Sequence, residues 1–297
     1  MLKLKYKNQN KDDMLFVAAV VIPITLLFLF IRFIPIGRSF VNSFYQKNLV
    51  LRTQVFNGLD NYTKLLQDKF FIRSLSNTLF VTFFATLLSV SAGLLLASIV
   101  NSKQNRLIRF GQAILFLPVV ISMVPATLIW KYIFDYNFGL LNYLATLAGL
   151  PKGNWLNNPA LTKWAVVIIS TWKEIGYNMM IFLVGLKAIP HELYESASID
   201  GAGKWHKFWA ITFPQLKPVT LFVLVVEIIK FIKVFTPAVV LTTGSQSSGE
   251  VFYTMVYYIY QTGFLLRQIG LASAASVILL VLVMLLTRIQ MIITKER

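Results

Sequence analysis

Residues 79–100 read LFVTFFATLLSVSAGLLLASIV, which is 22 consecutive residues without a charge. A second uncharged run, of 21 residues, extends from Phe110 to Trp130. A helix needs about 20 apolar residues to cross the hydrocarbon core of a bilayer. Both runs therefore predict membrane-spanning helices. The chain has 297 residues, of which 57% are hydrophobic and 13% charged, and we expect an all-α integral membrane protein.

The apolar runs predict six transmembrane helices in a single domain of residues 14–297, preceded by a short polar segment of residues 1–13. The first run, from Met14 to Pro35, is too long for the apolar region of a signal peptide, so we expect it to remain as a span. No internal repeat is evident, which argues against an inverted-repeat transporter fold. The expected spans are about 14–35, 78–100, 108–130, 164–187, 219–242 and 268–288.

The basic residues of the loops predict which way the chain faces. Lys and Arg outnumber Asp and Glu by 28 to 12, an excess that would suggest nucleic acid in a soluble protein. With the N-terminus inside, the internal segments hold 14 Lys or Arg in 63 residues, and the external segments hold 10 in 98. The positive-inside rule then places both termini in the cytoplasm of a bacterial cell, with membrane lipid and no nucleic acid as partner.

Several kinds of chemistry have no support in the composition. The chain has no Cys and two His, so disulfides and thiolate sites are excluded and a His-based metal site is not expected. The spans contain neither paired catalytic acids nor a His cluster, so we expect no metal, no bound cofactor and no enzymatic activity in this chain.

A polar, aromatic-rich stretch interrupts the apolar runs at residues 194–218, YESASIDGAGKWHKFWAITFPQLKP. Pro190 can open a short helix, and Asp200-Gly201 is a turn dipeptide because Gly accepts positive φ. A second helix is expected to carry Trp205, Phe208, Trp209 and Phe213 and to end at Pro214 and Pro218. The pattern predicts a cytoplasmic helix–turn–helix elbow at residues 190–217. It could anchor at the lipid headgroups, or it could dock on a soluble partner.

The same stretch resembles the EAA loop of the membrane subunits of binding-protein-dependent ABC importers. The family signature has Glu-Ala-Ala, then a Gly after three residues, then Ile-x-Leu-Pro after nine more. Two departures are visible, since Ser replaces the first Ala and Phe replaces Leu. The matching positions here are Glu195, Ser196, Ala197, Asp200, Gly201, Ala202, Ile211, Phe213 and Pro214.

The resemblance covers nearly the whole chain. NGLDNYTKLL at 57–66 is similar to the family's first external segment, and residues 115–142 are similar to its third span and the sequence that follows. WKEIGYNMMIFLVGLKAIPHELYESASIDGA at 172–202 points to the carbohydrate-uptake branch, which includes maltose, glycerol-phosphate and oligosaccharide permeases. The resemblance implies a type I importer fold with six spans, acting as a permease subunit for a sugar or oligosaccharide.

The resemblance also implies partners. Glu195 would contact a cleft of a cytoplasmic ABC ATPase dimer, with Ala197 packed close and Gly201 making the bend. A second homologous permease subunit and an extracytoplasmic solute-binding protein would complete the transporter. ATP and Mg²⁺ would bind the ATPase, because this chain has no P-loop: Trp205 follows Gly203-Lys204, and Ser198 stands where the first Gly is required.

Ionisable residues inside spans are costly and usually face a cavity or one another. Glu227, Lys230 and Lys233 are spaced to share one helical face, and Lys173 and Glu174 lie in the fourth span. One hypothesis is mutual pairing. The other is a translocation cavity, to which Tyr177 and Asn178 contribute and in which a spare Lys suits an acidic sugar. An ion-coupled secondary transporter using Glu174 or Glu227 is the alternative function.

Overall fold

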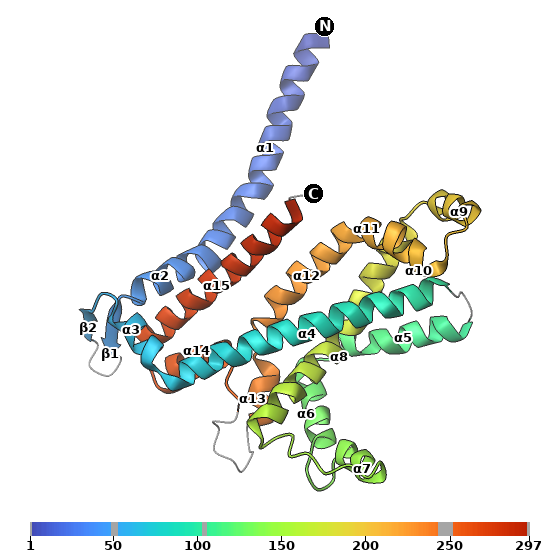
Figure 1. The fold of residues 1–297 in the computed structure, drawn as a ribbon. Coiled ribbons are helices and arrows are strands. Elements are labelled where there is room, and N and C mark those ends of the chain that lie inside the picture. Colours follow the sequence, from blue (N-terminus) through green and yellow to red (C-terminus); the bar gives the residue numbers. More distant parts are fainter. Residues whose placement is uncertain (1, 49–52, 103–105, 243–251, 296–297) are drawn as a thin grey trace. The chain divides into compact units, whose positions relative to one another are not determined.

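The structure is a computed structural model that describes residues 2–48, 53–102, 106–242 and 252–295. Most of the described chain is helical (Figure 1), as the apolar runs predicted. One short antiparallel hairpin, β1 (Tyr45–Asn48) and β2 (Thr53–Phe56), departs from the all-α prediction. Its register pairs Tyr45 with Phe56, whose rings lie 5.4 Å apart.

The chain forms two compact units. One unit comprises residues 1–65 and 261–278, and the other comprises residues 66–260 and 279–297. The elements of the first unit are α1 (Leu2–Phe28), the π-helical turn η1 (Leu29–Phe33), α2 (Ile34–Asn42), β1, β2, the start of α3 (Asp60–Gln67), the π-helical turn η3 (Gln261–Leu265) and the first part of α15 (Ile269–Lys295).

Within the first unit, the side chain of Asn61 binds the backbone between the end of α2 and the start of β1. The Asn61 side chain is buried and its Nδ2 donates to the carbonyls of Ser43, at 2.7 Å, and Tyr45, at 3.2 Å. Gly270 of α15 reaches the same place, since a Cβ there would collide with the Tyr45 carbonyl. The absence of a side chain thus permits this approach.

The second unit contains the elements that carry the predicted sites. Its helices are α4 (Lys69–Ser102), α5 (Arg106–Val120), α6 (Met123–Ile133), α7 (Leu140–Leu147), α8 (Pro159–Lys187), α9 (His191–Ile199), α10 (Lys204–Lys207), the π-helical turn η2 (Phe208–Thr212), α11 (Phe213–Gln215), α12 (Lys217–Phe231), α13 (Thr236–Thr242) and α14 (Met255–Tyr260).

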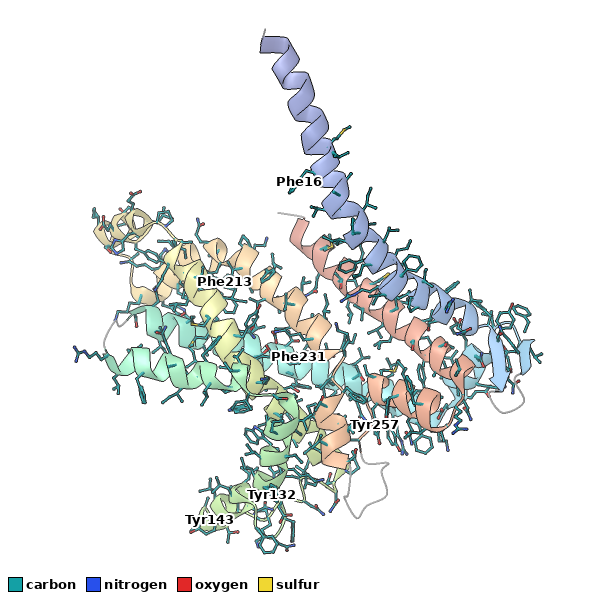
Figure 2. The ribbon with its side chains drawn as sticks, turned by 180° about the vertical axis from the view of Figure 1, so that it is seen from behind. Phe16, Tyr132, Tyr143, Phe213, Phe231 and Tyr257 are labelled. Carbon is teal, nitrogen blue, oxygen red and sulfur yellow. The ribbon has the colours of Figure 1, made fainter. Side chains whose placement is uncertain are left out.

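The long helices α4 and α8 cross at the centre of this unit (Figure 1). A Cβ built on Gly93 would lie 2.7 Å from Asn178 Cβ and 3.1 Å from the Met179 amide nitrogen, so glycine allows the backbones to approach. One apolar cluster includes Val81, Ile169 and Phe231, and the other includes Phe182, Leu186 and Leu216. Figure 2 shows Phe231 in this interior and shows Tyr132 and Tyr143 on the more peripheral α6 and α7.

Four continuous helices in the described residues are long and apolar enough to cross a membrane: Met14–Asn42, Lys69–Ser102, Pro159–Lys187 and Ile269–Ile292. They contain or closely overlap the predicted spans 14–35, 78–100, 164–187 and 268–288. The first helix, however, begins at Leu2, so the segment predicted as a separate polar N-terminus, residues 1–13, continues into the span.

Two of the predicted spans, 108–130 and 219–242, are not single continuous helices in the structure. The first is interrupted between α5 and α6, which meet at a bend of 106°. The second is interrupted between α12, which ends at Phe231, and α13, which begins at Thr236. A proline ring collides with the carbonyl four residues earlier and lacks the N–H that would bond to it. The carbonyls four residues before Pro125 and Pro237 are those of Ile121 and Lys233. These two residues lie in the breaks between α5 and α6 and between α12 and α13.

Candidate functional site

The elbow projects from the ends of α8 and α12 and begins with α9 (Figure 1). Pro190 is the N-cap of α9, with φ −57° and ψ 132°, so it starts the helix as predicted. No residue of α9 is buried, although the helix is flanked on both sides by well-packed spans. Only Tyr194 and Ala197 of this helix are half-buried, so most of its surface is available for contact.

A Schellman motif terminates α9 and makes the turn. The Ala202 amide donates to the Ala197 carbonyl at 2.9 Å, and the Gly201 amide donates to the Ser198 carbonyl at 3.1 Å. Gly201 has φ +75°, the left-handed conformation that this motif requires after the C-cap residue, Asp200. The predicted Asp200-Gly201 turn is confirmed.

Two side-chain bonds close the elbow across the turn. The Tyr194 hydroxyl of α9 lies 2.9 Å from Thr212 Oγ1, and Lys207 Nζ donates to Ser198 Oγ at 2.5 Å. Beyond them, Leu216 is buried against the cores of α8 and α12. Side-chain contacts thus join the two arms of the elbow and pack its second arm against α8 and α12.

The second arm of the elbow differs from its prediction. Pro214 does not end a helix, because helical backbone runs from Lys204 through Gln215 and resumes at Lys217. The wide π turn η2 comes directly before Pro214, and the Phe213 amide bonds to the Phe208 carbonyl. A wider turn relieves the conflict between the proline ring and the preceding turn. Pro218 likewise lies in the first turn of α12.

The predicted coupling residues are mostly on the surface of this elbow. Glu195 is exposed, and its Oε1 lies 3.0 Å from Nδ1 of His191 on the preceding turn of α9. Exposed positions also include Ser196, Asp200, Gly201 and Pro214, while Ala197, Ala202 and Ile211 are half-buried. Apolar side chains are exposed beside them: Ile199 at 87%, Trp205 at 75%, Trp209 at 50% and Phe213, labelled in Figure 2, at 41%.

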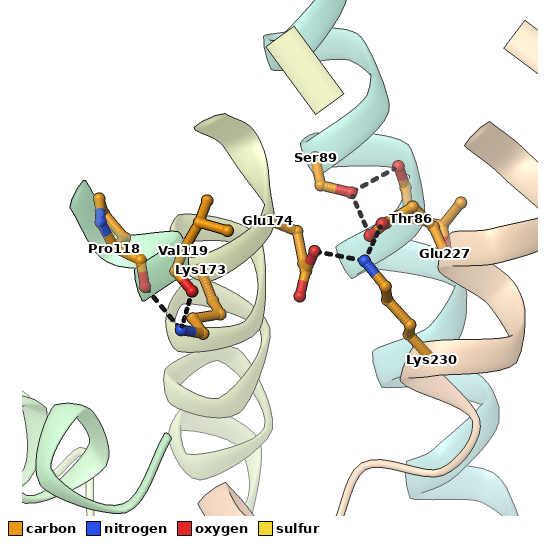
Figure 3. A network of polar contacts seen from close by, with 8 residues as sticks. All are labelled: Thr86, Ser89, Pro118, Val119, Lys173, Glu174, Glu227 and Lys230. Carbon is orange, nitrogen blue, oxygen red and sulfur yellow. Dashed lines mark hydrogen bonds and ion pairs between the residues drawn. The ribbon is translucent and has the colours of Figure 1, made fainter. Parts of the chain in front are cut away.

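The structure brings the predicted intramembrane charges into a network (Figure 3). Lys230 Nζ lies 2.6 Å from Glu174 Oε2 and 3.3 Å from Glu227 Oε1. The Glu227 side chain is completely buried, and Ser89 Oγ of α4 donates to its second oxygen at 3.4 Å. The hypothesis of mutual pairing is confirmed for these three charges.

Lys173 has a different set of partners although it is adjacent to Glu174. Its Nζ donates to the carbonyls of Pro118, at 2.6 Å, and Val119, at 3.1 Å (Figure 3). It also donates to the carbonyl of Ile121. Pro118 and Val119 lie in the last turn of α5, and Ile121 lies in the break that follows it. This ammonium group therefore caps a helix end.

Tyr177 and Asn178 lie beside the network on α8. Lys230 Nζ lies 4.2 Å from the centre of the Tyr177 ring, a cation–π contact in addition to its two carboxylate contacts. The Asn178 side chain is completely buried, near the Glu227 carboxylate. Neither residue lines the cavity described next.

A cavity of about 370 Å³ adjoins the charges at the break between α12 and α13. Lys233 lies in this break and not on the helical stripe that the spacing predicted, since α12 ends two residues earlier. Its side chain is exposed, and it makes no ion pair within the described part of the chain. The lining is Met123, Ser170, Lys173, Glu174, Lys230, Phe231, Lys233, Val234, Phe235, Thr236 and Pro237.

Sequence reasoning missed several participants. Ser89 and Ser170 lie in apolar runs, where a small hydroxyl side chain does not stand out. The carbonyls at the α5–α6 break are backbone groups, so no residue type in the sequence indicates them. Pro125 and Pro237 were the available signals for the two breaks. Among the described residues, no group of three or more His, Cys, Asp or Glu side chains could hold a metal ion.

Residues 69–296 match the model of the family described as "Binding-protein-dependent transport system inner membrane component". The chain belongs to this family. This inner membrane component is 35% identical over 91% of its length to the arabinooligosaccharides transport system permease protein AraP of Bacillus subtilis (strain 168), covering 85% of that protein. It is 32% identical to the sn-glycerol-3-phosphate transport system permease protein UgpA of Agrobacterium fabrum (strain C58), over 94% of each chain.

A solved structure has the same fold as this inner membrane component. It is a bacterial ABC transporter involved in the import of the acidic polysaccharide alginate, with a TM-score of 0.83 and 25% identity over 98% of both chains. The type I permease fold is thus confirmed for this multi-pass membrane protein. Its relatives are permease subunits rather than enzymes, and an ion-coupled secondary transporter is not favoured.

Proposed function

We propose that this permease takes up a sugar or oligosaccharide, with its elbow docked on a cytoplasmic ABC ATPase. The observation that carries the proposal is an elbow closed by a Schellman turn whose first helix, α9, buries no residue of its own. Such an element has the rigidity of a lever and an unoccupied contact surface. The twofold density of Lys and Arg in the segments grouped with the elbow supports its placement on the cytoplasmic side.

Movement of the elbow would reach the cavity through two helices. α9 follows α8 directly, and the second arm leads into α12, with Tyr194 and Thr212 joining the two arms at 2.9 Å. Glu174, near the middle of α8, and Lys230, near the end of α12, join the same helices again and line the cavity. Closure of an ATPase dimer on the elbow would therefore tilt α8 and α12 together and change access to the cavity.

The remaining assembly follows from the same proposal. A second permease subunit would form the other half of the pore, and an extracytoplasmic solute-binding protein would deliver the sugar. ATP and Mg²⁺ would be bound by the ATPase subunits, since this chain lacks the glycine-rich phosphate loop. The chain would lie in the bacterial cytoplasmic membrane with both termini in the cytoplasm.

The cavity suits a saccharide because it combines aromatic faces with charged hydrogen-bonding groups. Phe231 and Phe235 offer flat apolar surfaces, while Ser170 and the ammonium and carboxylate groups offer partners for hydroxyls. The relative named for arabinooligosaccharide transport supports this substrate class.

An acidic saccharide is a second candidate, favoured by Lys233. The cavity is lined by three Lys and one Glu, and Lys233 has no carboxylate partner in the described chain. A substrate carboxylate, sulfate or phosphate would supply one. We expect Lys233→Gln to raise the KM for an acidic oligosaccharide about tenfold and to leave uptake of a neutral one unchanged, since a charged hydrogen bond contributes about 1.5–3 kcal/mol.

The proposal is tested with the assembled transporter in proteoliposomes. ATP hydrolysis and uptake are measured with the binding protein and a panel of neutral and acidic oligosaccharides. We expect Glu195→Lys to abolish uptake and stimulated ATP hydrolysis while the subunits still assemble, and Glu192→Lys, on the same helix, to serve as a control for charge alone. Uptake that survives ATP depletion and collapses with an ionophore would contradict the proposal.

A further inference from the structure

The break between α5 and α6 leaves carbonyl groups without their usual helical partners. In an unbroken helix, the carbonyls of Pro118 and Val119 would accept from the amides of Ser122 and Met123. The backbone at Ser122 is extended, with φ −60° and ψ 144°, which takes these amides out of helical register. The Ile121 carbonyl has no helical partner in any case, because residue 125 is proline and has no N–H.

Lys173 provides one hydrogen-bond donor for each of these three carbonyls. A lysine ammonium has three N–H donors, and Lys173 Nζ donates to the same three carbonyls, those of Pro118, Val119 and Ile121. A cation also suits the C-terminal end of α5, where the helix dipole is negative. Within a bilayer core, water does not replace missing partners, and each unsatisfied backbone group costs several kcal/mol.

The neighbours of Lys173 on α8 allow its ammonium group to bind these carbonyls. The neighbouring carboxylate, Glu174, is bound to Lys230 of α12, so it does not draw Lys173 away from the carbonyls. α8 and α5 also touch directly, since a Cβ at Gly176 would collide with the Leu115 carbonyl. The ammonium is thereby fixed beside the break by backbone contact one turn along α8.

We propose that Lys173 is a positioning residue that holds α6 at its angle to α5 by replacing the lost helical donors. α6 begins at Met123, which lines the cavity, so the angle of the bend sets the position of Met123 in the cavity lining. Lys173 thus acts on transport through backbone geometry and not as a ligand for the substrate charge. Its effect on uptake rests on the proposed function, but its effect on the bend does not.

The bend is measured with spin labels, for which a chain without Cys is well suited. Leu107→Cys on α5 and Tyr132→Cys on α6 are exposed positions on either side of the break. With the observed bend of 106° their Cα atoms are separated by about 22 Å, whereas a straight helix at 1.5 Å per residue would separate them by about 38 Å. The distance distribution is recorded by double electron–electron resonance on the full chain in lipid nanodiscs.

We expect Lys173→Met to lose most of the short-distance population and Lys173→Arg, which keeps charge and donors, to retain it. Lys163→Met removes another lysine of α8, one whose contact is with the Phe80 ring, and should leave the distribution unchanged. Uptake by the Lys173→Met transporter should fall about tenfold, since misplacement by about 1 Å is known to slow a step by up to 100-fold. A short-distance population equal to wild type in Lys173→Met would overturn the proposal.

If Lys173→Met fails to fold, a second substitution that compensates for the lost hydrogen bonds still tests the proposal. Pro125→Ala restores the N–H that the Ile121 carbonyl lacks, so Pro125→Ala with Lys173→Met should recover folded chain with a longer label distance. Failure of the double variant to accumulate, when Pro125→Ala alone accumulates, would also overturn the proposal. A changed bend in Lys173→Met combined with no sugar uptake by the wild-type transporter would sink the proposed function and leave this inference standing.

Discussion

The Lys230 ammonium of α12 lies 2.6 Å from the Glu174 carboxylate of α8, although the two residues are 56 positions apart in the sequence. These are the two helices that the elbow connects at their ends. α8 and α12 are thus tied twice, once through the elbow and once through this ion pair beside the cavity. The relationship makes the two helices a mechanical unit between the predicted coupling surface and the predicted substrate path.

Lys230→Met should destabilise the permease by about 3 kcal/mol, because removing one partner leaves the buried Glu227 carboxylate without a counter-charge. Reversible unfolding of the purified protein in mixed detergent measures the change. Lys64→Met is the matched control, since it breaks an exposed pair with Asp60 that contributes no more than about 1 kcal/mol. Equal effects from the two substitutions would contradict the buried network.

Gly201→Ala should weaken the elbow turn by about 1 kcal/mol or more, because alanine is strained at φ +75°. The space around the glycine is open, so the strain arises between the added Cβ and the residue's own backbone and not from a neighbouring residue. The expected result is a lower ratio of stimulated to basal ATP hydrolysis with normal assembly. Gly203→Ala, two residues away with φ −70° and equally open space, should behave as wild type.

Tyr194→Phe and Thr212→Val should each weaken the link between the two arms of the elbow, and the double variant should be little worse than either. A shared hydrogen bond predicts a coupling energy of about 1 kcal/mol in this double-mutant cycle. Uptake and ATP hydrolysis are measured in parallel, and we expect uptake to fall more than hydrolysis. Strictly additive effects would show that the 2.9 Å contact is not a working bond.

Gly93→Ala should destabilise the crossing of α4 and α8 by about 1–3 kcal/mol, because the added Cβ lies 2.7 Å from Asn178 Cβ. The apparent melting temperature of the detergent-solubilised protein is the measurement. Gly111→Ala on α5 adds the same atom where nothing lies within 4 Å, and it should be neutral. A Gly93→Ala variant as stable as Gly111→Ala would mean that the helices do not cross so closely.

The elbow was largely predictable because its signals are local. Pro190, the Asp200-Gly201 pair and the aromatic positions act within a few residues, through backbone angles and helical spacing. Pro214 was misjudged because a π turn can accommodate a proline that a regular helix would exclude. Whether a helix ends or widens depends on the packing of the next turn, here the buried Leu216.

The members of the charge network were predictable from the sequence, and their pairing was predictable in part. Glu227 and Lys230 are three residues apart and pair as helical spacing suggests, whereas the separation of Lys173 from Glu174 onto different partners follows from where α5 and α12 lie. The prediction that Lys233 shares a helical face with Glu227 and Lys230 was wrong because α12 ends before Lys233. The proline responsible, Pro237, is in the sequence, but hydropathy alone continues across it.

The sequence alone determined that this chain crosses the membrane several times and carries one rigid polar elbow, because hydrophobic length, loop charge and turn residues act locally. Only the tertiary structure decided that the third and fifth spans are broken and that Lys173 caps one break. It also decided that Lys230 joins two helices at the edge of a cavity. Those facts depend on which backbone groups lose their partners and which distant side chains come within bonding distance, and no local pattern records either.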